Sequence, residues 1–305
     1  MTSPLATPAA PFGRVLTAMV TPFTPDGALD LDATKKLASY LVDEGSDGIV
    51  VSGTTGESPT TNPDEDGQLL AAVLEAVGDR ASVVAGVGNN DTQASARLAR
   101  QAASLGAHGM LLVSPYYNKP PQAGLVRHFM TVADAGDGVP VMLYDIPGRA
   151  VVRIAPETYA EVAKHEAIVA VKDAVGDLGS GARLMRETGL AWYSGDDPLN
   201  LAWLAYGAAG LVSVVSHVAA AKYASMVRAV DDGRLHDART INDELLDVVA
   251  AIMPPTSQGA IMTKAALQLM GVIENRTTRS PYVDATDEQV TALAQVLRDA
   301  TLLKD

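Results

Sequence analysis

The sequence predicts an α/β protein with a (β/α)8 TIM barrel and a C-terminal helical appendage. Short β-branched runs alternate with amphipathic segments through about residue 215, and eight such runs can be counted. The chain has 305 residues, enough for a barrel of the usual size of about 250 residues. After His217 only helical patterns follow. These observations favour a barrel with helices added at its C-terminal end.

Each expected element has its own local signal. The runs that read as strands are 14–23, 46–53, 81–88, 108–117, 139–148, 167–174, 191–197 and 210–217. Amphipathic segments lie between them, for example 32–45, 62–80, 92–106 and 156–166. In 62–80, Asn62 can cap the helix and Pro63 can take its first position. The helical patterns beyond the strands are 219–233, 235–253, 259–271 and 286–303.

These patterns also suggest how the chain is divided. We expect a flexible N-terminal tail over 1–11, the barrel over 12–230 and a helical region over 231–305. A doubly wound sheet is the alternative to a barrel. It is less favoured because "GVGNND", which begins at Gly86, lacks the third glycine of a dinucleotide-binding turn.

Composition excludes several classes of function. A net charge of −13 argues against a nucleic-acid partner, and the absence of cysteine excludes disulfides and thiolate chemistry. The five histidines show no metal-ligand spacing, and no Gly-x-Ser-x-Gly elbow is present. No apolar run approaches the roughly 20 residues of a membrane helix, and the N-terminus does not resemble a signal peptide. We therefore expect a soluble cytoplasmic protein without a metal site.

Lys172 is unusual because it ends the apolar run "AIVAV". A buried ammonium is costly, so Lys172 either forms a structural ion pair, with Asp173 beside it, or is kept partly neutral because it reacts. Alternation along the strand places Ile168, Ala170 and Lys172 on one face. By the same count Tyr144 stands at a similar height on the preceding strand.

Polar motifs follow several of the other expected strands. They are "SGTTGES" after the second, "SPYYNKP" after the fourth, "YDIPGR" at the fifth and "SGDD" at the seventh. Reactive groups in a barrel gather where the strands end. With "VKDA" at the sixth strand, these motifs resemble the pyruvate-dependent class I aldolase and lyase family, in order and over nearly the whole chain.

The resemblance implies a role for each matching residue. Lys172 would form a Schiff base with pyruvate, and Tyr144 would carry protons together with Thr54 and with Tyr117 from a neighbouring subunit. An amine reacts only when unprotonated, and burial lowers the pKa of lysine, which agrees with this role. The residues expected to bind substrate are Thr55 in the "GTTG" turn, Gly195, Val212 and Arg149.

Arg149 distinguishes branches of this family, because in the dipicolinate branch an arginine follows the Tyr-x-x-Pro turn. The resemblance then implies a lyase that condenses pyruvate with L-aspartate 4-semialdehyde, with no metal or organic cofactor, as a homo-oligomer and commonly a tetramer. The alternatives are an aldolase for N-acetylneuraminate or 2-keto-3-deoxy sugar acids, and a barrel that has lost catalysis and only binds.

Regulation by L-lysine is expected to be weak or absent. Ser58, Asn90 and Tyr116 match the effector site of lysine-inhibited members of the family. Pro63 and Asp66 stand where histidines are often found, and Ala94 replaces a glutamate. Alanine leaves a cationic amine without a carboxylate partner.

Overall fold

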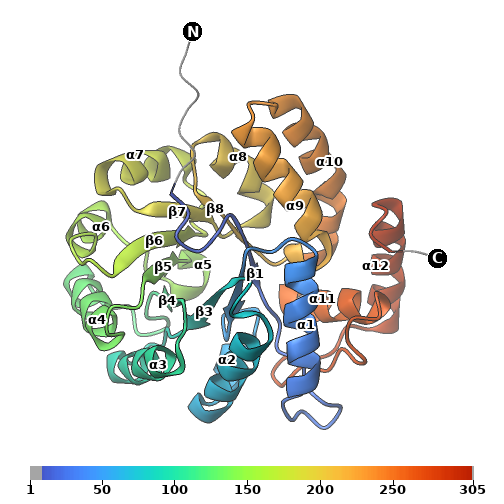
Figure 1. The fold of residues 1–305 in the computed structure, drawn as a ribbon, viewed down its shortest axis with the longest axis horizontal. Coiled ribbons are helices and arrows are strands. Elements are labelled where there is room, and N and C mark those ends of the chain that lie inside the picture. The colour runs from blue at the N-terminus through green and yellow to red at the C-terminus, as the bar shows by residue number, and fades with distance from the viewer. Residues whose placement is uncertain (1–8, 304–305) are drawn as a thin grey trace.

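The computed structural model describes residues 9–303, and its strands form one closed parallel barrel (Figure 1). The strands are β1 (Val15–Ala18), β2 (Gly48–Val51), β3 (Ser82–Gly86), β4 (Gly109–Val113), β5 (Val141–Asp145), β6 (Ile168–Asp173), β7 (Ala191–Ser194) and β8 (Gly210–Ser213). Each strand pairs with the next along the chain, and β1 also pairs with β8, so the sheet has no free edge. The predicted fold class is confirmed.

Helices surround the barrel and extend it at the C-terminal end. Those before β8 are α1 (Leu31–Asp43), α2 (Pro63–Val77), α3 (Thr92–Leu105), α4 (Gln122–Ala135), α5 (Pro147–Ala150), α6 (Pro156–Val162), α7 (Leu178–Thr188) and α8 (Asn200–Ala205), with 3-10 turns at Ser58–Thr60 and Asp197–Leu199. After β8 come α9 (Ser216–Asp231), α10 (Leu235–Ile252), α11 (Gly259–Leu269) and α12 (Asp287–Asp299). In Figure 1, α10, α11 and α12 gather on one side of the barrel.

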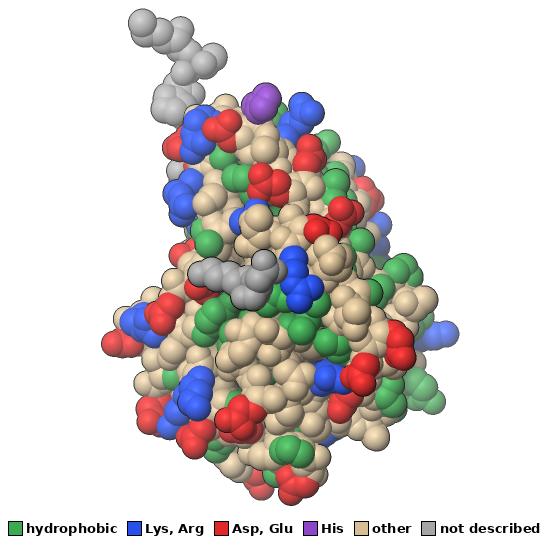
Figure 2. All heavy atoms as spheres, turned by 90° about the vertical axis from the view of Figure 1, so that its right-hand side faces the viewer, with side chains coloured by type: hydrophobic (Ala, Val, Ile, Leu, Met, Phe, Trp, Pro, Cys, Tyr) green, Lys and Arg blue, Asp and Glu red, His purple; other side chains and the backbone are tan. Residues whose placement is uncertain are grey.

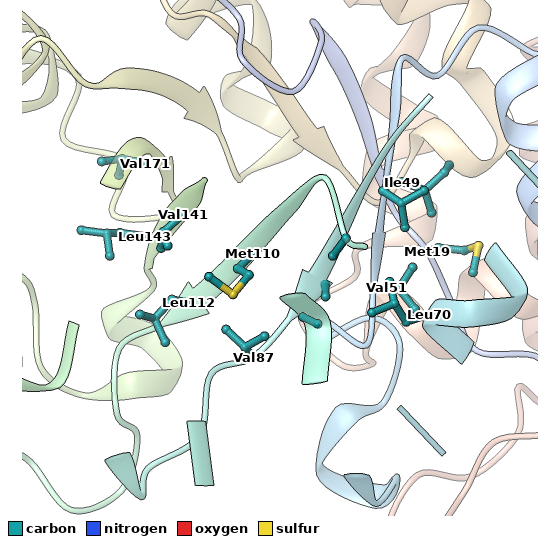
Figure 3. Close-up of a cluster of buried hydrophobic side chains, with 14 of the residues drawn as sticks. Met19, Ile49, Val51, Leu70, Val87, Met110, Leu112, Val141, Leu143 and Val171 are labelled. Carbon is teal, nitrogen blue, oxygen red and sulfur yellow. The ribbon is translucent and has the colours of Figure 1, made fainter. Parts of the chain in front are cut away.

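The strands separate two hydrophobic layers. Ile49 and Val51 point outward into the layer between strands and helices, shown in Figure 3, whereas Val50 points into the lumen. This alternation is the normal consequence of the pleat, in which successive side chains take opposite faces. The C-terminal helices have a further cluster of their own, which they share with α9 and with Leu211 of β8.

The expected alternation fails at the start of β6. Val141 pairs with Ile168 but Met142 pairs with Ala170, so Val169 is an extra residue in the register. Ile168 consequently lies in the outer layer, while Ala170 lies in the lumen. The prediction that Ile168 shares a face with Ala170 and Lys172 was wrong because of this bulge.

The ends of individual elements follow local chemistry. The Asn62 carboxamide caps α2 by accepting from the backbone N–H groups of Asp64 and Glu65, and Pro63 begins the helix as predicted. The strand expected over 210–217 is shorter, because α9 already begins at Ser216.

Of the expected N-terminal tail, residues 1–8 lie outside the described residues, and the division of the chain near residue 230 stays a prediction. Among the described residues, no helix combines the length and apolarity needed to cross a bilayer. Figure 2 shows acidic and basic side chains interspersed on the face that carries α12.

Candidate active site

The motifs that end the strands surround a cavity of about 460 Å³ at the C-terminal end of the barrel. The predicted site residues that line it are Thr54, Thr55, Tyr144, Arg149, Lys172 and Gly195. Its outer wall comes from the connection between α10 and α11 and from Tyr282. The barrel therefore brings residues from five strand ends, those of β2, β5, β6, β7 and β8, and from the C-terminal region to one place.

Lys172 is 5% exposed, and its Nζ lies 4.3 Å from the centre of the Tyr144 ring. Burial lowers the pKa of Lys172 to about 8, the Asp197 carboxylate opposes that fall, and the Arg149 guanidinium adds to it. Within the described part of the chain, no carboxylate forms an ion pair with Lys172. The Asp173 carboxylate instead accepts from the backbone N–H groups of Val175 and Gly176. This geometry favours a reactive amine over a structural ion pair with Asp173.

Tyr144 lies on β5 directly opposite Lys172 on β6, and only 5% of it is exposed. Burial raises the pKa of the Tyr144 phenol to about 12, while Arg149 and a hydrogen bond with the Thr54 side chain oppose the rise and Asp196 adds to it. The phenol is consequently protonated at neutral pH and can donate a proton. Two of the three expected relay residues, Tyr144 and Thr54, are in contact.

Tyr117, the third expected relay residue, does not line this cavity. It follows β4, is 85% exposed and has a left-handed backbone with φ of 72°. Such a conformation is uncommon for an aromatic residue and indicates a constrained loop. A single chain therefore does not place Tyr117 beside Tyr144.

The expected pyruvate-binding residues take different positions. Thr55 lines the cavity and is 8% exposed. At Gly195 a Cβ atom would lie 2.8 Å from Lys172 Cγ, so only glycine leaves the lysine its space. Val212 lies in the lumen cluster below, and Val214 is the residue of this segment that lines the cavity.

Arg149 lies in the short helix α5 at the rim of the cavity. Its Nη2 donates a hydrogen bond to Gln258 Oε1 at 2.6 Å. The guanidinium lies in an exposed position at the edge of the cavity. The N–H donors that do not bond to Gln258 can bind a carboxylate there.

Sequence reasoning did not select Asp196, Gln258 or Tyr282, although all three line the cavity. Asp196 stands in the quoted "SGDD" motif, and burial, with the neighbouring Asp197, raises the pKa of its carboxyl. Gln258 and Tyr282 belong to the C-terminal region, whose sequence pattern indicates only a helical appendage. A break between two helical patterns, as at Gln258, is the signal that could have indicated a loop facing the mouth.

Another cavity, of about 320 Å³, shares no lining residue with the first and matches the expected effector site in part. We call it the second cavity. Ser58, Pro63, Asp66, Ala94 and Tyr116 line it. Asn90 does not line it, and Asn89 does. Among the described residues, no cluster of His, Asp and Glu is suited to hold a metal ion.

A parallel barrel with a buried lysine of lowered pKa at its mouth, next to a protonated phenol, defines a lyase of the Schiff-base-forming class I aldolase type. The chain belongs to the dihydrodipicolinate synthetase family, whose model matches residues 11–300. The resemblance that the motifs indicated is thereby confirmed.

Individual relatives cover almost the whole chain. The 4-hydroxy-tetrahydrodipicolinate synthase of Kineococcus radiotolerans is 58% identical over 301 residues, which are 99% of this chain and 97% of the relative. That of Acidothermus cellulolyticus is 56% identical and covers 94% and 92%. The crystal structure of dihydrodipicolinate synthase from Cyanidioschyzon merolae with lysine bound has a TM-score of 0.93, 40% identity, and coverage of 97% and 100%.

Proposed function

We propose that the protein condenses pyruvate with L-aspartate 4-semialdehyde to give 4-hydroxy-tetrahydrodipicolinate, in the diaminopimelate and lysine biosynthesis pathway. The observation that carries the proposal is the buried Lys172 amine against Tyr144, in a cavity whose rim holds Arg149. The identity of 58% to a 4-hydroxy-tetrahydrodipicolinate synthase supports the same reaction.

The chemistry begins with attack of Lys172 Nζ on the keto carbon of pyruvate, and loss of water from the carbinolamine leaves an imine. Tyr144 and Thr54 move the protons that this step requires. The imine then loses a methyl proton and becomes an enamine, whose carbon attacks the aldehyde carbon of the semialdehyde. The substrate amine finally attacks the imine carbon, closes the ring and releases Lys172. These steps require neither a metal nor an organic cofactor.

Two carboxylates must be held while this happens. We assign the pyruvate carboxylate to Thr55 and the amides of its turn, with Val212 below and Gly195 beside the lysine. Arg149 takes the carboxylate of the semialdehyde, because a guanidinium can bind it with two parallel hydrogen bonds.

The proton relay is complete only with a neighbouring subunit. We propose that Tyr117 enters the cavity of a second copy, which makes the protein at least a dimer and, as in its family, commonly a tetramer formed by two dimers. The exposure and constrained backbone of Tyr117 support this assignment. Pyruvate and the semialdehyde are the only ligands that we expect the protein to bind in catalysis. A cytoplasmic location stays a prediction from the sequence.

The substrate is tested by a coupled assay that compares aspartate semialdehyde with other aldehydes and with cleavage of N-acetylneuraminate and 2-keto-3-deoxy sugar acids. We expect turnover with aspartate semialdehyde to exceed the others by at least about tenfold. Faster cleavage of a sugar acid would assign the protein to another branch, and no turnover of any of them would favour a barrel that only binds.

A further inference from the structure

Glu57 is an unusual residue in the loop that follows β2. It is 1% exposed and its backbone is left-handed, with φ of 59°. Residues other than glycine and asparagine adopt this conformation rarely, so its occurrence at a buried glutamate points to a specific use. Glu57 belongs to the loop that carries Thr54 and Thr55, and its backbone N–H donates to the Thr54 carbonyl at 3.1 Å.

The two carboxylate oxygens of Glu57 hold two separate segments of the C-terminal region. Oε1 accepts from Lys264 Nζ at 2.5 Å, and Lys264 lies in α11, whose first turn lines the cavity. Oε2 accepts from the backbone N–H of Arg279 at 2.9 Å. The Arg279 carbonyl in turn accepts from the backbone N–H of Tyr282 at 3.0 Å. One side chain thus joins three walls of the same cavity.

The pair is buried on all sides. Lys264 is 1% exposed, its ammonium lies 4.3 Å from the centre of the Phe23 ring, and it donates a further hydrogen bond to the Thr277 carbonyl at 2.8 Å. Burial lowers the pKa of Lys264, and the Glu57 carboxylate opposes that fall. A buried ion pair adds little net stability compared with apolar residues of the same shape, but it tolerates only one arrangement of its partners.

We propose that Glu57 and Lys264 are positioning residues for the second substrate. They hold the start of α11 and the Tyr282 loop against the Thr54 turn, and Gln258, the residue before α11, contacts Arg149. The inference rests on the proposed function, because it assigns the outer wall of that site to recognition of the semialdehyde. Lys172 and Tyr144 lie on β6 and β5 outside this network. The Thr54 turn is itself closed by backbone hydrogen bonds, from the Glu57 N–H to the Thr54 carbonyl and from the Ser58 N–H to the Gly53 carbonyl, which a change at Lys264 leaves in place. We therefore expect imine formation with pyruvate to persist when the Lys264 ammonium is removed.

Lys264→Met tests the proposal, with Lys222→Met as the matched control. Lys222 forms an ion pair with Glu244 at 2.6 Å, away from the cavity. In Lys264→Met we expect the start of α11 to shift, so that Arg149 loses one charged contact with the semialdehyde carboxylate. The KM for the semialdehyde should then rise at least about tenfold. Borohydride trapping of pyruvate should stay within about twofold of wild type, and amide hydrogen exchange over 277–282 should accelerate. Lys222→Met should leave all of these quantities unchanged.

The measurements are made well below the unfolding temperature of each variant. If Lys264→Met does not fold, Glu57→Gln/Lys264→Met carries the test with the same expectations, since no unpaired charge remains buried. An unchanged KM for the semialdehyde in a folded variant would overturn the inference, as would a parallel loss of trapping and turnover. Failure of wild type to trap pyruvate would instead refute the proposed function, so the two failures are distinguishable.

Discussion

Lys172 and Tyr144 face each other across β6 and β5, and burial acts on their two titratable groups in opposite directions. It lowers the pKa of the Lys172 amine to about 8 and raises the pKa of the Tyr144 phenol to about 12. Both shifts favour the neutral form. A neutral amine can attack a carbonyl, and a neutral phenol can donate a proton. The same buried environment therefore keeps both groups in the protonation state that the reaction needs.

Borohydride reduction in the presence of pyruvate should add one pyruvate-derived mass at Lys172, located by peptide mass spectrometry. The reason is that an imine on a lysine is reduced to a stable amine. Lys172→Ala should abolish the label, while Lys222→Ala, away from the cavity, should retain it. A label on any other lysine, or none on wild type, would remove the basis of the mechanism.

The rate of pyruvate trapping should rise with pH through about 8, because only the unprotonated Lys172 amine attacks. With that pKa about a tenth of the amine is neutral at pH 7 and about nine tenths at pH 9. The profile should therefore climb roughly tenfold and then level off. A profile that still climbs at about pH 10.4, the ordinary pKa of lysine, would show that burial does not activate Lys172.

Arg149→Ala should reduce semialdehyde turnover by at least about tenfold, since a lost charged hydrogen bond costs about 1.5–3 kcal/mol. Trapping of pyruvate should persist, because burial, the largest cause of the lowered pKa of Lys172, remains when the Arg149 guanidinium is removed. Arg153→Ala is the control, since Arg153 pairs with Asp177 and does not line the cavity. Equal loss of turnover and trapping in Arg149→Ala would indicate a structural role.

Gly195→Ala should slow trapping of pyruvate by at least about tenfold without unfolding the protein. The new Cβ would lie 2.8 Å from Lys172 Cγ and 2.9 Å from the Asp173 carbonyl oxygen, so the lysine has to move. Gly148→Ala is a matched control in the same cavity, since a methyl group at that position would meet nothing within 4 Å. Similar rates in the two variants would show that Gly195 does not shape the lysine's position.

The sequence allowed the inner wall of the site to be predicted because its determinants are local. Lys172 and Tyr144 end apolar strands, and neighbouring parallel strands bring such ends to one height. The same alternation failed at Ile168, since a bulge depends on how two strands pair and leaves no mark in one strand alone.

The outer wall could not be predicted in this way. Glu57 and Lys264 are 207 residues apart and meet only because α11 packs against the mouth of the barrel. Gln258 and Tyr282 reach the cavity for the same reason. Contacts of this kind depend on tertiary packing, which periodicity and capping signals in the sequence do not reveal.

L-lysine should inhibit poorly or not at all. In the second cavity, Ala94 offers no carboxylate for the cationic amine of L-lysine. Arg97 also lines this cavity, and its guanidinium repels a cationic amine. Each lost charged contact weakens binding about tenfold or more. The measurement is an inhibition curve for L-lysine at saturating pyruvate and near-KM semialdehyde.

Asp66 is the side chain that could reverse this expectation, because its carboxylate also lines the second cavity. Burial raises the pKa of Asp66, and the Thr61 hydroxyl already donates to it at 2.8 Å, so it is a poor substitute for an exposed glutamate. Ala94→Glu should therefore lower the half-inhibitory concentration of L-lysine at least about tenfold, whereas Asp66→Asn should change it little. Half-inhibition of wild type below about 1 mM, lost in Asp66→Asn, would instead show that Asp66 binds the amine and preserves control.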